Sequence, residues 1–157
     1  MSCDAVAFAA TLWLASTSAM PAPPSAPAVV SAPASVAAEP LFAEIVRRAD
    51  QLKSQTQAYE KAPLDAGAAQ LAGFTGFEAE IAKLSELDMQ GHVALVQRGV
   101  TDDLKCILKG ISQDLPVKLK AFQDAPDAKA RHAALQDMFY LLRDNVEVIT
   151  SPPQPPA

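Results

Sequence analysis

The sequence predicts an all-α protein, an antiparallel up-down four-helix bundle with a kinked, long third helix. Apolar residues recur every three or four positions through four segments, and proline or glycine separates these segments. No segment shows the alternation that is typical of a β-strand. Short connections between helices of similar length favour antiparallel neighbours, and 157 residues suffice for one such domain.

The first two helices are expected in the segments on either side of Pro63. The first helix should begin at Pro40, because proline is favoured at the first helical position, and end before Pro63. The second should begin after Asp65, a good N-cap residue, and end near Gly91, which would act as its C-terminal cap. Three glycines near the start of this second helix weaken it.

The third helix is expected to run from Met89 to Phe122. Residues at helical spacing form one apolar stripe along it: Met89, Val93, Val96, Val100, Leu104, Ile107, Ile111, Leu115, Leu119 and Phe122. Pro116 predicts a kink or short break near Ser112, because proline loses a helical hydrogen bond and clashes with the preceding turn. The stripe keeps its phase through this interruption, which favours one bent helix over two. The fourth helix is expected from Pro126 to Ile149.

The two ends of the chain differ in composition from its middle. The apolar run in residues 5–15 has the length of a signal-peptide core and is too short to cross a bilayer. We expect a leader in residues 1–19, although Asp4 stands where a basic residue is usual; a buried N-terminal helix is the alternative. Residues 20–39 should form a disordered proline- and alanine-rich tether, residues 40–150 the bundle, and residues 151–157 a proline-rich tail. The leader predicts secretion, to the extracellular space or cell wall, or to a bacterial periplasm.

Charge and motif content exclude several classes of function. The net charge is −5 and the basic residues are scattered, which argues against nucleic acid or an anionic membrane as a partner. The two cysteines and two histidines match no zinc or haem pattern, and no nucleophile and base can be paired. Cys106 lies beside the apolar stripe and is expected to be half-buried. We therefore expect a protein that is not an enzyme and has no metal, no cofactor and no transmembrane segment.

Four stretches that follow the expected leader occur in the same order as the corresponding stretches of a known protein family. They are Ala49–Leu52 through Tyr59, Leu64–Leu71, Leu115–Phe122, and Leu135 through Ile149 to Pro153. Between Leu41 and Pro153 this order resembles the fungal hydrophobic-surface-binding protein A family, which includes related cell-wall mannoproteins. The resemblance is one of pattern. It implies a secreted, non-enzymatic bundle that adsorbs to apolar surfaces and, in some relatives, encloses a fatty acid.

The leading hypothesis from the sequence is therefore a secreted helical protein that binds hydrophobic surfaces, lipid or fatty acid. Glycines and Pro116 would loosen the helices enough to admit an acyl chain, each buried methylene contributing roughly 0.8 kcal/mol. The expected apolar lining is Phe74, Phe77, Leu104, Ile107, Ile111, Leu115, Leu119 and Phe139. Alternatively the helices only cover one another, in a structural or adaptor module of a bacterial periplasm that acts through protein–protein contacts.

Overall fold

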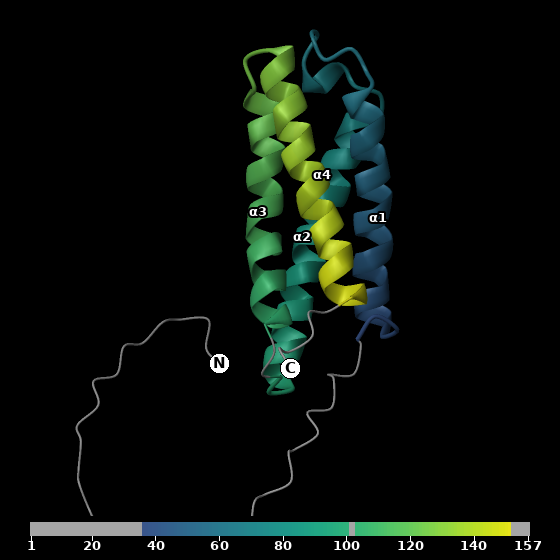
Figure 1. Cartoon of the computed structure of the whole chain (residues 1–157), viewed down its shortest axis with the longest axis vertical. Helices are drawn as coiled ribbons and strands as arrows, with labels where there is room; N and C mark the ends of the chain where they lie inside the picture. Colours follow the sequence, from purple (N-terminus) through teal and green to yellow (C-terminus); the bar gives the residue numbers. More distant parts are fainter. Residues whose placement is uncertain (1–35, 101–102, 152–157) are drawn as a thin grey trace, which may run out of the picture.

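The computed structural model describes residues 36–100 and 103–151. These residues form α1 (Pro40–Glu60), a short 3-10 turn η1 (Ala68–Gln70), α2 (Phe74–Gln97), α3 (Leu104–Asp124) and α4 (Ala128–Thr150). The helices lie side by side and run alternately up and down, each packed against its two neighbours in the ring α1–α2–α3–α4 (Figure 1). The predicted all-α, antiparallel up-down bundle is confirmed. The expected leader, most of the tether and residues 152–157 of the tail lie outside the described residues.

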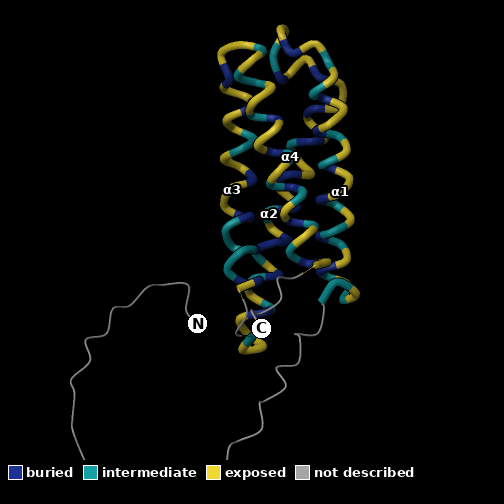
Figure 2. The backbone as a smooth tube through the Cα atoms, in the orientation of Figure 1, coloured by how far each residue is buried: buried dark blue, intermediate teal, exposed yellow. Residues whose placement is uncertain are grey.

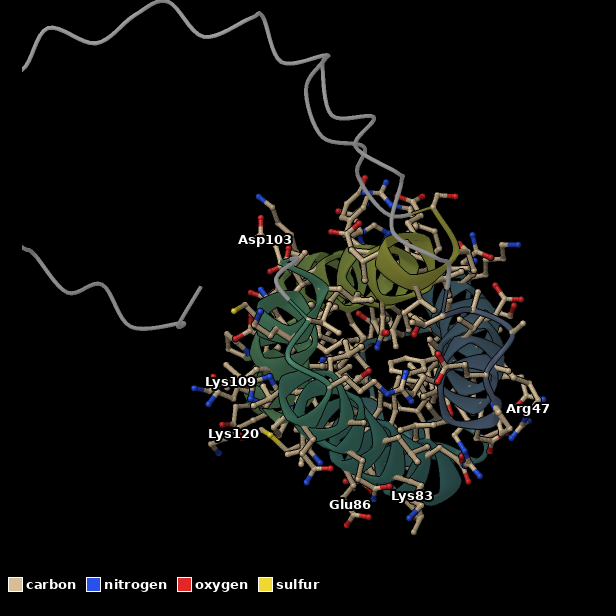
Figure 3. The ribbon with its side chains drawn as sticks, turned by 90° about the horizontal axis from the view of Figure 1, so that it is seen from below. Arg47, Lys83, Glu86, Asp103, Lys109 and Lys120 are labelled. Carbon is tan, nitrogen blue, oxygen red and sulfur yellow. The ribbon has the colours of Figure 1, made fainter. Side chains whose placement is uncertain are left out.

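One apolar core runs the length of the bundle, and the buried stretches of every helix face it (Figure 2). On α1, Ile45, Ala49, Leu52 and Tyr59 recur at helical spacing and are all buried. Charged side chains such as Arg47 and Lys109 point away from the bundle (Figure 3). None of the helices in the described residues is long and apolar enough to cross a membrane.

The second helix begins later than the sequence predicts. Asp65 does not cap it; the chain instead makes the 3-10 turn at Ala68–Gln70 and enters α2 at Phe74. Gly67 and Gly73 have φ angles of +92° and +74°, a region that glycine adopts easily and other residues rarely do. These two positive angles break the expected helix, so the connection between α1 and α2 is longer than expected.

The expected long third helix from Met89 to Phe122 is wrong. The segment from Met89 to Gln97 belongs to α2, and the chain turns at Gly99, where φ is +66°. The amide of Gly99 donates to the Val96 carbonyl and that of Val100 to the Leu95 carbonyl, which is the Schellman pattern of a helix C-terminus. The apolar spacing kept its phase across this turn by coincidence.

Gly91 does not cap α2 but lies buried inside it, at the closest approach of three helices. A Cβ atom at Gly91 would lie 3.1 Å from Leu108 Cδ1 of α3. It would lie 3.3 Å from Ile45 Cδ1 and 3.4 Å from Phe42 Cε1, both on α1. Glycine at this position therefore allows α2 to pack tightly against both neighbours.

α3 continues through Pro116 without the expected break. Proline has no amide hydrogen, so the carbonyl four residues earlier, that of Ser112, lacks its helical donor. The hydroxyl of Ser85 on α2 replaces that donor with a hydrogen bond of 2.7 Å to the Ser112 carbonyl. The neighbouring helix thus compensates locally for the proline.

Ser85→Ala is expected to lower the free energy of unfolding by about 1–3 kcal/mol, because it leaves the partly buried Ser112 carbonyl without a donor. Urea denaturation followed by circular dichroism measures this change. Ser54→Ala is the matched control, since the exposed Ser54 hydroxyl only donates to a carbonyl of its own helix. Equal effects of the two substitutions would contradict the compensation.

The fourth helix lies close to the predicted position. Asp127 caps it, since its carboxylate accepts a hydrogen bond of 2.7 Å from the Ala130 amide. α4 therefore begins at Ala128, two residues after Pro126, and ends one residue beyond Ile149.

Candidate functional site

The eight expected lining residues lie on three helices and do not surround one cavity. Phe74, Phe77, Leu104, Ile111 and Leu115 are buried in the core, Ile107 and Leu119 pack partly buried against it, and Phe139 is half-buried. Phe74 begins α2 and Leu104 begins α3, so they lie at opposite ends of the bundle. The predicted lining is therefore spread along the core.

Aromatic side chains gather at the end of the bundle where α2 begins. The ring centroids of Phe74 and Phe77 lie 6.2 Å apart, and Phe122 of α3 meets Phe74 edge-on at 5.7 Å. Tyr59 of α1 meets Phe77 edge-on at 5.3 Å. Phe139 lies outside this cluster and contacts Tyr140 instead. The aromatic cluster closes this end of the core with favourable edge-to-face contacts.

Two shallow clefts lie on the surface of the described residues. One, of about 390 Å³, is lined by Ala66–Ala69, Phe74, Thr75, Glu78 and Gln123. The other, of about 220 Å³, is lined mostly by polar side chains of α1 together with Glu80 of α2. Of the expected lining residues only Phe74 reaches either cleft. An apolar ligand would have to enter by moving helices apart, because its lining is already covered by the bundle.

The helices do not contact one another equally. α2 packs most extensively against α3, and α1 against α4, whereas α1 and α2 share the least extensive of the four neighbouring interfaces. The bundle therefore consists of two halves, the α1–α4 half and the α2–α3 half. The halves are joined covalently by the connection between α1 and α2 and by the three-residue connection between α3 and α4. They pack against each other at the α3–α4 interface and along the α1–α2 seam, the interface between α1 and α2.

Polar contacts cover the α1–α2 seam. The guanidinium of Arg48 on α1 contacts the carboxylates of Glu44 on its own helix and Glu80 on α2. Hydrogen bonds from Arg47 and from Arg48 lower the pKa of Glu44 to about 2, so this group stays ionised. Such partly exposed ion pairs contribute little to stability, because the solvent screens them. Weak polar contacts cover the outer edge of the seam, and beneath them apolar side chains of the two helices, such as Tyr59 and Phe77, pack against each other.

One polar pair lies inside the core. Asp88 of α2 and Asn145 of α4 are both fully buried, and Asn145 Nδ2 donates a hydrogen bond of 2.8 Å to Asp88 Oδ2. The remaining oxygens, Asp88 Oδ1 and Asn145 Oδ1, are buried without a donor. Burial raises the pKa of the Asp88 carboxyl to about 8, although the Asn145 hydrogen bond opposes the shift. The spacing of apolar residues does not predict this pair, because it gives no information on which polar residues are buried.

The described residues contain no group of three or more histidine, cysteine or acidic side chains that could hold a metal ion. His92 makes a structural hydrogen bond: its Nδ1 lies 2.6 Å from the carbonyl oxygen of Lys105, across the turn between α2 and α3. Cys106 is partly buried and is not a free thiol in the structure.

The chain matches no family model, no curated protein and no solved structure.

Proposed function

We propose that this chain is a secreted, non-enzymatic protein that binds hydrophobic surfaces or lipid by opening along the α1–α2 seam. One observation carries the proposal: the least extensive helix interface lies directly over a continuous apolar core. Opening there would turn the core faces of both halves toward an external apolar phase. Burying that area against the phase would offset the loss of helix packing, at roughly 25 cal/mol for each Å² removed from water.

The residues that face each other across the seam define where opening would begin. Leu52 of α1 lies in the floor of the 220 Å³ cleft, and the Arg48–Glu80 contact spans the cleft. The eight expected lining residues would then be the apolar surface offered to a lipid chain, with those on α2 and α3 moving as one half. The proposed contact therefore lies on an interface that moves, and of the eight expected lining residues only Phe74 reaches either of the two clefts described above.

A chemical crosslink across the seam tests the proposal. In the full chain carrying Cys106→Ser, Arg48→Cys and Glu80→Cys are joined by a short bis-maleimide, and adsorption to polystyrene beads is followed by depletion from solution. We expect adsorption to slow at least roughly tenfold, because the locked bundle cannot separate its halves. Titration with a long-chain fatty acid by calorimetry gives the second readout.

The control crosslink lies on the opposite side of the bundle. Lys118 of α3 and Asp137 of α4 form an ion pair of 2.9 Å, and joining cysteines at these positions locks the interface about which the halves would turn. This variant should adsorb like the parent. Adsorption that is unaffected by either crosslink, or absent in the parent, would overturn the proposal.

A second candidate function is favoured by the outer face of α2. Val93 and Val96 are 44% and 50% exposed, although they belong to the stripe that the sequence assigned to the core. This face lies near the lower end of α2, which extends past the ends of α1 and α4 (Figure 1). A structural or adaptor module that contacts another protein could use this stripe. Such contacts need no seam opening, so the crosslink at positions 48 and 80 would leave them unchanged.

A further inference from the structure

The Asp88–Asn145 hydrogen bond crosses the middle of the bundle. α2 and α4 are not neighbours in the ring but face each other across it, as the view along the bundle shows (Figure 3). The 2.8 Å contact therefore joins the α2–α3 half to the α1–α4 half through the core. Both side chains are fully buried, so this contact is not open to bulk solvent.

The pair has too few hydrogen-bond donors for its acceptors. Asn145 supplies its amide hydrogen to Asp88 Oδ2, while Asp88 Oδ1 and Asn145 Oδ1 are both acceptors without a donor. A proton on Asp88 Oδ1 turns that atom into a donor for which the Asn145 carbonyl oxygen is an available acceptor. The neutral acid and the amide then satisfy each other, whereas the ionised acid leaves a charge and a carbonyl dipole unpaired in the core.

Three basic groups on the surrounding helices are engaged elsewhere. On α1, Arg48 contacts Glu44 and Glu80, and on α3, Lys105 donates to the Val100 carbonyl. On α4, Arg143 pairs with Asp144 and Glu147. Burial and the Asn145 hydrogen bond are the influences that set the pKa of Asp88, with no charged partner among them. Among the described residues, no cation therefore contributes to the pKa of this carboxyl.

We propose that Asp88 and Asn145 form a proton-controlled latch between the two halves of the bundle. With the carboxyl neutral, the pair holds the halves together; loss of the proton releases them, and the bundle opens along the α1–α2 seam. The inference rests on the proposed function only in naming that seam as the interface that opens. It adds the regulation: mildly alkaline solution favours the open form and acidic solution the closed form.

The expected direction follows from the raised pKa. Because burial raises the pKa of Asp88 to about 8, the carboxyl is mostly neutral at pH 6 and mostly ionised at pH 9. Opening should rise between these values. Asn145→Ala removes the hydrogen bond that joins the halves, so this variant should already be open at pH 6.

Distances between spin labels on the two halves test the latch without any apolar surface present. In the full chain carrying Cys106→Ser, labels at the exposed positions Gln51 of α1 and Lys83 of α2 span the seam. We expect the distance distribution to broaden and lengthen from pH 6 to pH 9. Asp88→Asn keeps an amide in place of the neutral acid and should hold the short distance at both pH values.

A second label pair and a separate assay make the result specific. Labels at Lys120 of α3 and Gln136 of α4, both exposed, should report little change with pH. The latch is wrong if the seam distance does not change with pH in the parent, or if Asp88→Asn changes as the parent does. The bead assay fails or succeeds independently: opening with pH but no adsorption would overturn the proposed function and leave the latch standing.

Discussion

Asp88→Asn is expected to raise the free energy of unfolding at pH 7 by roughly 2–4 kcal/mol and to remove most of its dependence on pH. In the native state burial raises the pKa of Asp88 from 3.8 to about 8. Between these two values the native state holds a proton that the unfolded chain has released. Raising the pH therefore favours unfolding over this interval, by about 1.4 kcal/mol per pH unit, and the loss levels off above pH 8.

The asparagine variant avoids this loss because an amide does not ionise. Its oxygen can accept from Asn145 Nδ2, and its own amide hydrogen can donate to Asn145 Oδ1, the acceptor that lacks a donor in the parent. The substitution hardly changes side-chain volume, so the core packing is preserved. The gain is a large fraction of the 5–15 kcal/mol by which domains are typically stable.

Guanidinium denaturation at pH values from 5 to 9 measures this effect. Asp114→Asn is the matched control, because Asp114 is exposed on α3 and the charge changes by the same amount. The control should keep the slope of the parent. If Asp88→Asn retained that slope, another group would be responsible for the pH dependence.

The parts of the fold that the sequence predicted depend on local signals. Pro40 marks the start of α1, and Pro126 lies two residues before the start of α4. Both helices carry an apolar stripe whose members recur at each helical turn. Helix period and end signals agree there, so the boundaries were nearly correct. The sequence also identified the all-α class and the up-down order, because short connections allow few other arrangements.

The boundary between α2 and α3 could not be found from spacing alone. Met89, Val93 and Val96 continue the period of α3, but the face of α2 that is buried carries Leu87 and Leu95 instead. Gly99 has the positive φ of a C-terminal cap, but the sequence alone does not distinguish this role from that of a glycine inside a helix. Two helices whose apolar periods happen to match across a turn look like one.

The candidate site depends on contacts between segments that are distant in the sequence. Asp88 and Asn145 are separated by 57 positions, and each alone resembles an ordinary surface residue of a helix. Their burial follows from how α2 and α4 are rotated about their axes in the bundle. The periodicity of apolar residues does not show which polar residues this rotation buries. The α1–α2 seam is likewise a property of helix packing.

Gly91→Leu is expected to lower the free energy of unfolding by about 3 kcal/mol or more, because overpacking a filled core forces side chains and backbone to move. The first added carbon would already lie 3.1 Å from Leu108 Cδ1 and 3.3 Å from Ile45 Cδ1. Thermal unfolding and urea denaturation at pH 6, where Asp88 is neutral, measure the loss. Gly110→Leu is the matched control: Gly110 is also within a helix, a Cβ there meets nothing within 4 Å, and the substitution should stabilise by roughly 0.5–1 kcal/mol.

The same substitution also separates packing from function. Leucine at position 91 pushes against Ile45 and Phe42 of α1, so it acts as a wedge in the α1–α2 seam. If opening along this seam precedes adsorption, Gly91→Leu should adsorb to polystyrene beads faster than the parent at pH 6, while Asp88→Asn adsorbs more slowly than the parent at pH 9. If another destabilised variant, such as Ser85→Ala, adsorbed as fast as Gly91→Leu, general unfolding would be what exposes the core. Opposite effects of the wedge and the latch variant, with Ser85→Ala close to the parent, would tie adsorption to this one interface.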